Sequence, residues 1–200
     1  MTLDIYYDNP NDASDMYLKW LKKDCEENNI QVRVFDNLPT FWKESSNSKA
    51  SLFLEPIQDK HAKVLQGCIN NNVDRPSATA EGIYRYITKN YPDRATTIAV
   101  IGRGLVGKQL INQLIDYGYT VCEFNSKSIK RDMEYFCLEQ ADVVVGLATE
   151  QIFDKEICNL LTDSNTTLID ASNNFDINYK LRCGKWTRNV IIERIKALEE

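Results

Sequence analysis

Three glycines between residues 102 and 107 form the most chemically specific pattern in this sequence. Gly102, Gly104 and Gly107 stand in the order G-x-G-x-x-G within "AVIGRGLVGKQL". Glycine at the first position permits a tight turn, at the second lets the backbone approach a pyrophosphate, and at the third lets a helix pack closely on a strand. The pattern therefore predicts a dinucleotide-binding turn with the anion at a helix N-terminus. The alternative is a turn between strand and helix that binds no ligand.

Polar and basic residues near this turn bear on which dinucleotide it binds. An Asp or Glu at the end of the following strand usually holds the ribose diol of a cofactor that lacks a 2′-phosphate. Here that strand runs into "NSKS", and Glu123 comes two residues early, where the alternation of strand side chains favours the opposite orientation. Arg103, Ser126 and Lys127 are instead donors that suit a phosphate, which favours NADP over NAD. The alternative is that Arg103 and Lys127 are solvated surface charges.

Short apolar strands alternate with helical patterns through most of the chain. Strand patterns occupy 3–7, 30–35, 50–56, 97–102, 119–124, 141–148 and 166–171. Helical patterns occupy 14–29, 60–68, 80–91, 104–118, 130–140, 154–161 and 187–200, whereas 36–49 has the composition of a polar loop. This alternation is typical of βαβ crossovers and a parallel sheet, so the predicted fold class is α/β.

A change in composition at residues 69–79 separates two lobes. The stretch "INNNVDRPSAT" is rich in asparagine and small residues and contains Pro76, which is typical of a link. We therefore expect a small N-terminal α/β lobe at 1–78 and a Rossmann-type parallel-sheet domain at 79–185. The final segment, 186–200, carries an amphipathic helix that we expect to return to the N-terminal lobe.

Composition and charge argue against several classes of protein. The net charge of −5 argues against a general nucleic-acid binder, which needs a basic face. A polar N-terminus, and the lack of an apolar run of ~20 residues, predict a cytoplasmic protein with neither a signal peptide nor a membrane span. The six cysteines form no C-x-x-C pair and His61 is the one histidine, so neither a metal site nor a Ser-His-Asp triad is expected.

Segments along nearly the whole chain match, in order, the motifs of one enzyme family. They are "YYDNPNDASDMYLKWLKKDCEENNI", "LFLEPI", "NNNVDRPSATAEGI", "VIGRGLVGKQL", "VCEFNSKS", "ADVVVGLAT", "LIDAS" and "CGKWTRNVIIERI". The chain thereby resembles the bifunctional methylenetetrahydrofolate dehydrogenase/methenyltetrahydrofolate cyclohydrolase family, as a shortened and divergent member. The resemblance implies a folate substrate, a homodimer and a dehydrogenase that uses NADP.

The resemblance also assigns residues to a folate site and a cofactor site. In the folate site, the expected catalytic residues are Tyr17, which matches the family's tyrosine, and Asp74, which matches an aspartate of its D-V-D-G motif. In the cofactor site, Arg103 and Ser126 match two motifs that lie side by side at the adenosine end. The full set expected to bind the cofactor is Gly102, Arg103, Gly104, Leu105, Val106, Gly107, Asn125, Ser126, Lys127, Ala148 and Thr149.

Two departures from the family pattern bear on the reaction. The family's lysine, four residues after the tyrosine, falls on Leu21, and Lys22 is about 100° further around the helix. The family's V-Q-L-P glutamine falls on Leu54. Cyclohydrolysis must activate water through a group of tuned pKa, whereas hydride transfer needs mainly positioning. We therefore expect a dehydrogenase in which the cyclohydrolase activity is weak or lost.

Two other functions are compatible with the same residues. A non-catalytic nucleotide-binding or interaction protein would follow if Leu21 and Leu54 belong to an apolar core that has closed the folate site. Another small dehydrogenase with a redesigned pocket is the third alternative. Turnover of methylene-tetrahydrofolate would exclude the second function, and a thermal-shift screen with candidate acids would distinguish the third.

Overall fold

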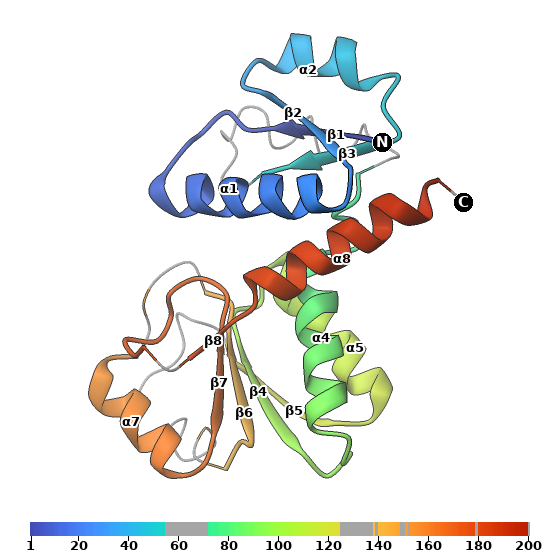
Figure 1. Cartoon of the computed structure of the whole chain (residues 1–200). Helices are drawn as coiled ribbons and strands as arrows, with labels where there is room; N and C mark the ends of the chain where they lie inside the picture. Colours follow the sequence, from blue (N-terminus) through green and yellow to red (C-terminus); the bar gives the residue numbers. More distant parts are fainter. Residues whose placement is uncertain are drawn as a thin grey trace. The chain divides into compact units, whose positions relative to one another are not determined.

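The computed structural model describes residues 1–54, 72–124, 138, 140–148, 151, 153–178 and 180–199. The chain forms two compact units, unit 1 from Met1–Ala78 with Arg188–Glu200, and unit 2 from Thr79–Thr187. Each unit is a parallel sheet flanked by helices, which confirms the α/β class predicted from the sequence (Figure 1). The helix predicted at 60–68 lies outside the described residues, as does nearly all of the one at 130–140.

The described sheet of unit 1 has three parallel strands in the order β2-β1-β3. Its elements are β1 (Thr2–Tyr6), β2 (Gln31–Phe35), β3 (Ala50–Phe53), α1 (Asp12–Glu27), α2 (Leu38–Ser45) and most of α8 (Gly184–Ala197). Successive residues of β1 face opposite sides of the sheet. Leu3 and Ile5 enter a core formed with α1 and α8. Tyr6 packs against Phe41 of α2. Helix α2 lies on the opposite side of this sheet from α1 (Figure 1).

Helix α1 begins with a capping box. The Asn11 side chain accepts the backbone N–H of Ser14 at 3.0 Å, and the Ser14 hydroxyl accepts the N–H of Asn11 at 3.1 Å. This exchange satisfies donors that have no partner inside the helix. Leu18, Leu21 and Cys25, three or four residues apart, form the buried stripe that packs into the core of unit 1.

The segment predicted as a polar loop at 36–49 contains helix α2. Asn37 caps the helix, with its side-chain oxygen 3.0 Å from a backbone nitrogen of the first turn, and Pro39 fits that turn. Phe41 is fully buried against Tyr6. Leu38 and Trp42 pack in the same cluster as Phe41, at helical spacing. The loop prediction was wrong because this apolar pattern spans only five residues within a polar segment.

The described sheet of unit 2 has five parallel strands in the order β5-β4-β6-β7-β8. These are β4 (Thr97–Ile101), β5 (Thr120–Phe124), β6 (Val143–Gly146), β7 (Thr167–Asp170) and β8 (Leu181–Arg182). Helices α4 (Ala78–Asn90) and α5 (Leu105–Tyr117) cover one face, and α7 (Lys155–Asp163) covers the other (Figure 1). The sequence predicts four of these strands and misses β8, because two residues are too few to form a pattern.

Both faces of this second sheet are buried. Along β4, Ile98 and Val100 pack in the core under α4 and α5, whereas Ala99 and Ile101 pack in the core under α7. All four side chains are fully buried. A parallel sheet covered on both sides is encoded by a continuous apolar run, which is why "TIAVI" marks the strand without alternation.

Helix α8 supplies part of the core of unit 1. Val190, Ile191 and Ile195 lie in the same buried cluster as Leu21 of α1. The Arg194 guanidinium donates to the carbonyl oxygen of Val73 at 2.8 Å. The last helix of the chain is therefore required to complete the hydrophobic core that begins with β1.

Replacing Phe41 with alanine should destabilise unit 1, because truncation leaves a cavity beside Tyr6, Phe35 and Phe53. We expect the free energy of unfolding to fall by about 3–5 kcal/mol, as for other buried phenylalanines. Trp20→Ala removes a side chain that is 46% exposed and should change it by less than about 1 kcal/mol. Urea denaturation measures both variants, and equal losses would show that α2 does not pack as described.

Candidate functional site

The glycine turn between β4 and α5 is constrained by close packing at its two ends. A Cβ at position 107 would lie 1.9 Å from the carbonyl oxygen of Gly102, which no side chain can tolerate. Gly102 has a φ of 112°, and a Cβ there would lie 2.8 Å from the carbonyl carbon of Leu147. The contact between strand and helix therefore requires glycine at Gly102 and Gly107, whether or not a ligand binds.

The middle glycine has a different environment. Among the described residues, apart from its two chain neighbours and the backbone of α5, no heavy atom lies within 4 Å of the place where a Cβ on Gly104 would stand. Gly104 is the N-cap of α5 and supplies no capping side chain. The N–H groups of Leu105, Val106 and Gly107 have no partner inside the helix, because they belong to its first turn. Open space at the positive end of a helix fits a pyrophosphate, so this turn meets the requirements of a dinucleotide site.

The carboxyl ends of three neighbouring strands meet at the glycine turn. The Gly102 N–H donates to the carbonyl of Phe124, at the end of β5, at 2.9 Å. The Leu147 N–H, just after β6, donates to the carbonyl of Ile101 at 2.8 Å. The buried Ala148 follows directly. Ligands of open α/β sheets bind at this edge, so Ala148 lies at an edge that suits the cofactor contact expected of it.

Arg103 in the glycine turn forms an ion pair with Glu123 of β5. The Nη2 atom of Arg103 lies 3.0 Å from Oε2 of Glu123, and the two side chains are 56% and 33% exposed. The sequence analysis predicted that the Glu123 side chain faces away from the glycine turn, and this prediction was wrong. Glu123 starts on the same face of the sheet as Val121, which packs in the core under α5, and the turn that leads into α5 brings Arg103 to that face.

The structure gathers seven of the expected cofactor residues at one edge of the sheet. They are Gly102, Arg103, Gly104, Leu105, Val106, Gly107 and Ala148. Asn125, Ser126, Lys127 and Thr149 lie outside the described residues, and their roles stay predictions.

A buried ion pair at the same sheet edge was missed by the sequence analysis. Asp170, the last residue of β7, has a fully buried side chain whose Oδ2 lies 2.8 Å from the ammonium of Lys180. Its Oδ1 accepts the backbone N–H groups of Ser172 and Asn174. A buried carboxylate needs such a partner. An aspartate after the apolar run "TLI" signals a polar strand end, but nothing in the sequence points to a lysine ten residues later.

Both residues assigned to a folate site are held by defined contacts within unit 1. Tyr17 lies on α1 with its ring 5.8 Å below the guanidinium of Arg188, and Arg188 Nε lies 2.5 Å from Asp24 Oδ2. This stacking and ion pair restrain the ring plane of Tyr17. Asp74 stands just before α4, where its Oδ1 accepts the N–H of Ala78 at 2.7 Å. One carboxylate oxygen of Asp74 therefore helps to begin that helix.

The two positions that depart from the family pattern lie in apolar core. Leu21 is fully buried and Leu54 is 7% exposed, and both belong to the cluster that contains Ile5 of β1. Lys22 is exposed to solvent, on a different side of α1 from Leu21, as the helix geometry predicts. The position one helical turn beyond Tyr17 thus carries no group that exchanges a proton.

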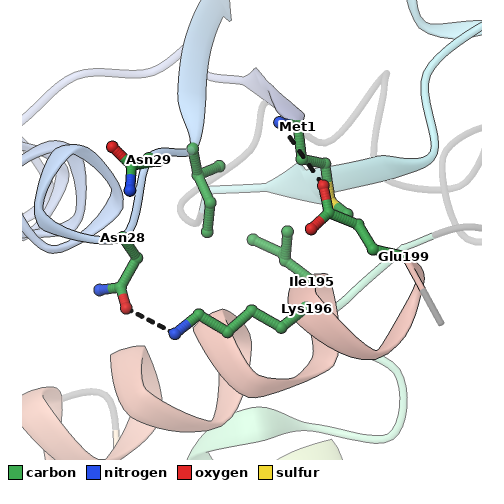
Figure 2. A pocket seen from close by; sticks show the side chains of 7 residues that line it. Met1, Asn28, Asn29, Ile195, Lys196 and Glu199 are labelled. Carbon is green, nitrogen blue, oxygen red and sulfur yellow. Dashed lines mark hydrogen bonds and ion pairs between the residues drawn. The ribbon is translucent and has the colours of Figure 1, made fainter.

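Unit 1 also has an open pocket of about 550 Å³ that none of Tyr17, Asp74, Leu21 and Leu54 lines (Figure 2). Its lining residues are Met1, Asn28, Asn29, Ile30, Ile195, Lys196 and Glu199. The Lys196 ammonium donates to Asn28 Oδ1 at 2.7 Å, and the N-terminal amine lies 3.6 Å from Glu199 Oε1 (Figure 2). Met1 and Ile30 precede β1 and β2, so this pocket opens at the amino ends of the strands. Ligands of parallel sheets bind at the carboxyl ends, so we assign no substrate to it.

Two buried cysteines are poor candidates for nucleophiles. Burial raises the pKa of the Cys25 thiol to about 12 and that of Cys183 to about 11. A nucleophilic cysteine needs a lowered pKa, so neither thiol is set up for covalent catalysis. In the described part of the chain, no group of three or more His, Cys, Asp or Glu side chains is arranged to hold a metal ion. No described helix is long and apolar enough to cross a membrane.

Comparisons with known proteins bear on the fold. No protein-family model matches the sequence, and a comparison with curated proteins finds no match. The NAD-dependent 5,10-methylenetetrahydrofolate dehydrogenase of Saccharomyces cerevisiae matches with a TM-score of 0.78 and 15% identity, over 99% of this chain and 86% of its own. The fold is that of the methylenetetrahydrofolate dehydrogenases.

Two further structures support the same assignment of fold. The methylenetetrahydrofolate dehydrogenase-cyclohydrolase of Trypanosoma brucei, solved with NADP and an inhibitor, has a TM-score of 0.74 and 12% identity, over 98% of this chain and 86% of its own. The bifunctional methylenetetrahydrofolate dehydrogenase/cyclohydrolase of Campylobacter jejuni has a TM-score of 0.71 and 17% identity, over 99% of this chain and 87% of its own. At these identities the similarity establishes a shared fold, and at that level it confirms the resemblance found in the motifs.

Alanine substitutions at two glycines of the turn should separate packing from ligand binding. Gly107→Ala forces a methyl group onto the Gly102 carbonyl, and we expect it to lower the free energy of unfolding by about 3 kcal/mol or more. Gly104→Ala meets open space and should lower it by less than about 1 kcal/mol, while weakening dinucleotide binding. Urea denaturation and cofactor titration measure the two effects. Similar destabilisation by both substitutions would contradict the described turn.

Proposed function

We propose that this protein is a nicotinamide-dependent oxidoreductase that acts on the one-carbon unit of 5,10-methylene-tetrahydrofolate and has weak or no cyclohydrolase activity. One observation carries the proposal: packing demands glycine at Gly102 and Gly107, yet in the described part of the chain nothing packs against the Cβ position of Gly104 at the start of α5. A glycine that packing does not require, at the point where a pyrophosphate would approach, is explained by a bound dinucleotide. The fold shared with methylenetetrahydrofolate dehydrogenases supports the choice of substrate.

The cofactor would be held mainly by backbone atoms. The first-turn N–H groups of α5 would bind the pyrophosphate, and Arg103 would act at the adenosine end. Ala148 and Thr149, together with Asn125, Ser126 and Lys127, are the further contacts that we propose. When bound, the nicotinamide ring supplies the acceptor for a hydride. The protein's part is to bind and orient this group, because hydride transfer from a methylene bridge needs no strong base.

The folate would be oriented by Tyr17 and Asp74 in unit 1. Arg188 restrains the ring plane of Tyr17, so its hydroxyl can be presented to a ligand with little loss of side-chain entropy. The N–H of Ala78 fixes Asp74 in the same way, through its Oδ1 atom. We assign both residues a positioning role in binding substrate.

This chain lacks the lysine that the family resemblance assigns to cyclohydrolysis, because leucine stands at that position, Leu21. Cyclohydrolysis requires a positioned acid or base, which contributes about 10²–10⁴-fold to rate. Leu21 and Leu54 are buried apolar residues at the positions where the family has its lysine and glutamine. Lys22 is exposed on another side of α1 and does not substitute for the lysine. The proposed activity therefore stops at the oxidation step.

The same two leucines favour a second candidate function. If the core around Leu21 and Leu54 has closed the folate site, the protein would bind a nucleotide without catalysis and act as a nucleotide-binding or interaction protein. In that case the cofactor would bind to unit 2, and adding a folate would change neither its affinity nor the thermal stability of the complex.

A paired activity assay tests the proposed reaction. With 5,10-methylene-tetrahydrofolate and NAD or NADP, we expect the absorbance of reduced nicotinamide to rise. Hydrolysis of 5,10-methenyl-tetrahydrofolate should be at least about a hundredfold slower than oxidation, because no proton carrier is positioned. Cofactor binding without any turnover at high enzyme concentration would support the non-catalytic candidate instead.

Tyr17→Phe tests the assigned folate site. The substitution keeps the ring under Arg188 and removes only the hydroxyl, so kcat/KM for the folate should fall about five- to tenfold while cofactor affinity stays constant. Tyr84→Phe, at another partly buried tyrosine, is the matched control and should leave both quantities unchanged. Unchanged kcat/KM in Tyr17→Phe would remove Tyr17 from the site.

The proposal includes a homodimer in the cytoplasm. Both properties follow from the family resemblance and the sequence, and a reducing compartment suits the four described cysteines, which are free thiols. Light scattering at micromolar concentration should give twice the mass of one chain. A single-chain mass at that concentration would contradict the dimer.

A further inference from the structure

We propose that Glu123 sets the cofactor preference of this protein, favouring NAD over NADP by accepting the adenosine ribose hydroxyl and by keeping Arg103 from a 2′-phosphate. The inference rests on the dinucleotide site of the proposed function and adds a specificity-determining residue to it. The sequence alone favours NADP over NAD, because strand alternation predicts that Glu123 faces away from the glycine turn. The inference reverses that preference.

Glu123 lies next to the glycine turn. Its neighbour Phe124 accepts the N–H of Gly102 at 2.9 Å, so the end of β5 is joined directly to the glycine turn. The Glu123 carboxylate lies 3.0 Å from the Arg103 guanidinium, within that turn. An acid at the end of the second strand of a dinucleotide fold is where the ribose diol of NAD is bound. Glu123 therefore occupies the specificity position, although it stands one residue before the end of β5.

The Glu123 carboxylate can accept more hydrogen bonds than its contact with Arg103 uses. An ionised carboxylate has about four acceptor sites on two oxygens, and the 3.0 Å contact with Arg103 is made by one of these oxygens, Oε2. A ribose 2′-hydroxyl is a donor, so Glu123 can accept it while it keeps Arg103. NAD would therefore bind without breaking the ion pair.

The negative charge of Glu123 disfavours a 2′-phosphate at this position. A 2′-phosphate has no proton to donate at neutral pH and carries roughly two negative charges. Beside Glu123 it would be repelled, and it would have to compete for the guanidinium that Glu123 already holds. NADP would bind only after Arg103 changed partner, and this lowers its affinity relative to NAD.

The pair adds little to stability, and this makes the inference testable. Both side chains are partly exposed, and exposed ion pairs contribute about 0–1 kcal/mol to folding. Removing the charge of Glu123 should leave the unit folded. A change in cofactor preference would then report on the site itself.

Calorimetric titration with four ligands tests the inference without any turnover. The ligands are NAD, NADP and their adenosine fragments 5′-AMP and adenosine 2′,5′-bisphosphate. Wild-type protein should bind NAD at least about tenfold more tightly than NADP, in line with one charge-assisted hydrogen bond. Glu123→Gln should bind NADP about tenfold more tightly than wild type and NAD about tenfold more weakly, and the fragments should follow the same order.

Two further variants keep the test specific. Glu156→Gln removes an exposed negative charge from α7 and should leave both affinities unchanged. The double variant Glu123→Gln/Arg103→Ala should lose the gain in NADP affinity, because the guanidinium freed by the first substitution is gone. Thermal unfolding of each variant confirms that it is folded.

The outcomes separate this inference from the function on which it rests. Equal affinity of wild type for NAD and NADP, or an unchanged ratio in Glu123→Gln, overturns the role of Glu123 and leaves the proposed oxidoreductase standing. The expected switch without oxidation of methylene-tetrahydrofolate supports Glu123 and overturns the proposed reaction. If neither cofactor nor either fragment binds to wild type, both are overturned.

Discussion

The contact between β4 and α5 is the constraint on which the cofactor half of this molecule depends. The carbonyl oxygen of Gly102 lies where a side chain at position 107 would begin, so strand and helix approach as closely as two backbones can. This approach holds the N-terminus of α5 against the carboxyl ends of β4, β5 and β6. Because the helix start is fixed there, the N–H groups of its first turn, Arg103 and Ala148 come to one edge of the sheet.

The two units differ in how much of a binding site they retain. In unit 2, no described residue beyond its chain neighbours and the backbone of α5 lies within 4 Å of a Cβ at Gly104, so packing among the described residues does not require glycine at this positive helix end. Unit 1 has buried leucines at Leu21 and Leu54, where the family resemblance places a lysine and a glutamine. Under the proposed function, apolar residues at these two positions suit hydride transfer, which depends on orientation, better than hydrolysis, which needs a positioned acid or base.

Local patterns in the sequence predicted the parts of the fold that local physics controls. The strand "TIAVI" and the glycine turn were predicted because an apolar run and three glycines are visible within a dozen residues. Helix α2 was missed because its apolar pattern, Leu38, Phe41 and Trp42, is short and packs against residues distant in sequence. The pair of Asp170 and Lys180, and the contact of Glu123 with Arg103, were missed for a similar reason. Partners separated by a loop or a helix leave no periodic signal, and strand alternation gives a face but not the reach of a side chain.

Transfer of isotope from the substrate is the most direct test that this chain oxidises a folate-bound carbon. Methylene-tetrahydrofolate carrying two deuterium atoms on its methylene bridge would be incubated with the protein and oxidised cofactor, and the reduced cofactor analysed by mass spectrometry. We expect one deuterium in each reduced nicotinamide, because the hydride moves directly from the bridge carbon. Reduced cofactor without deuterium, or no reduction by a protein that binds the cofactor, would contradict the proposed reaction.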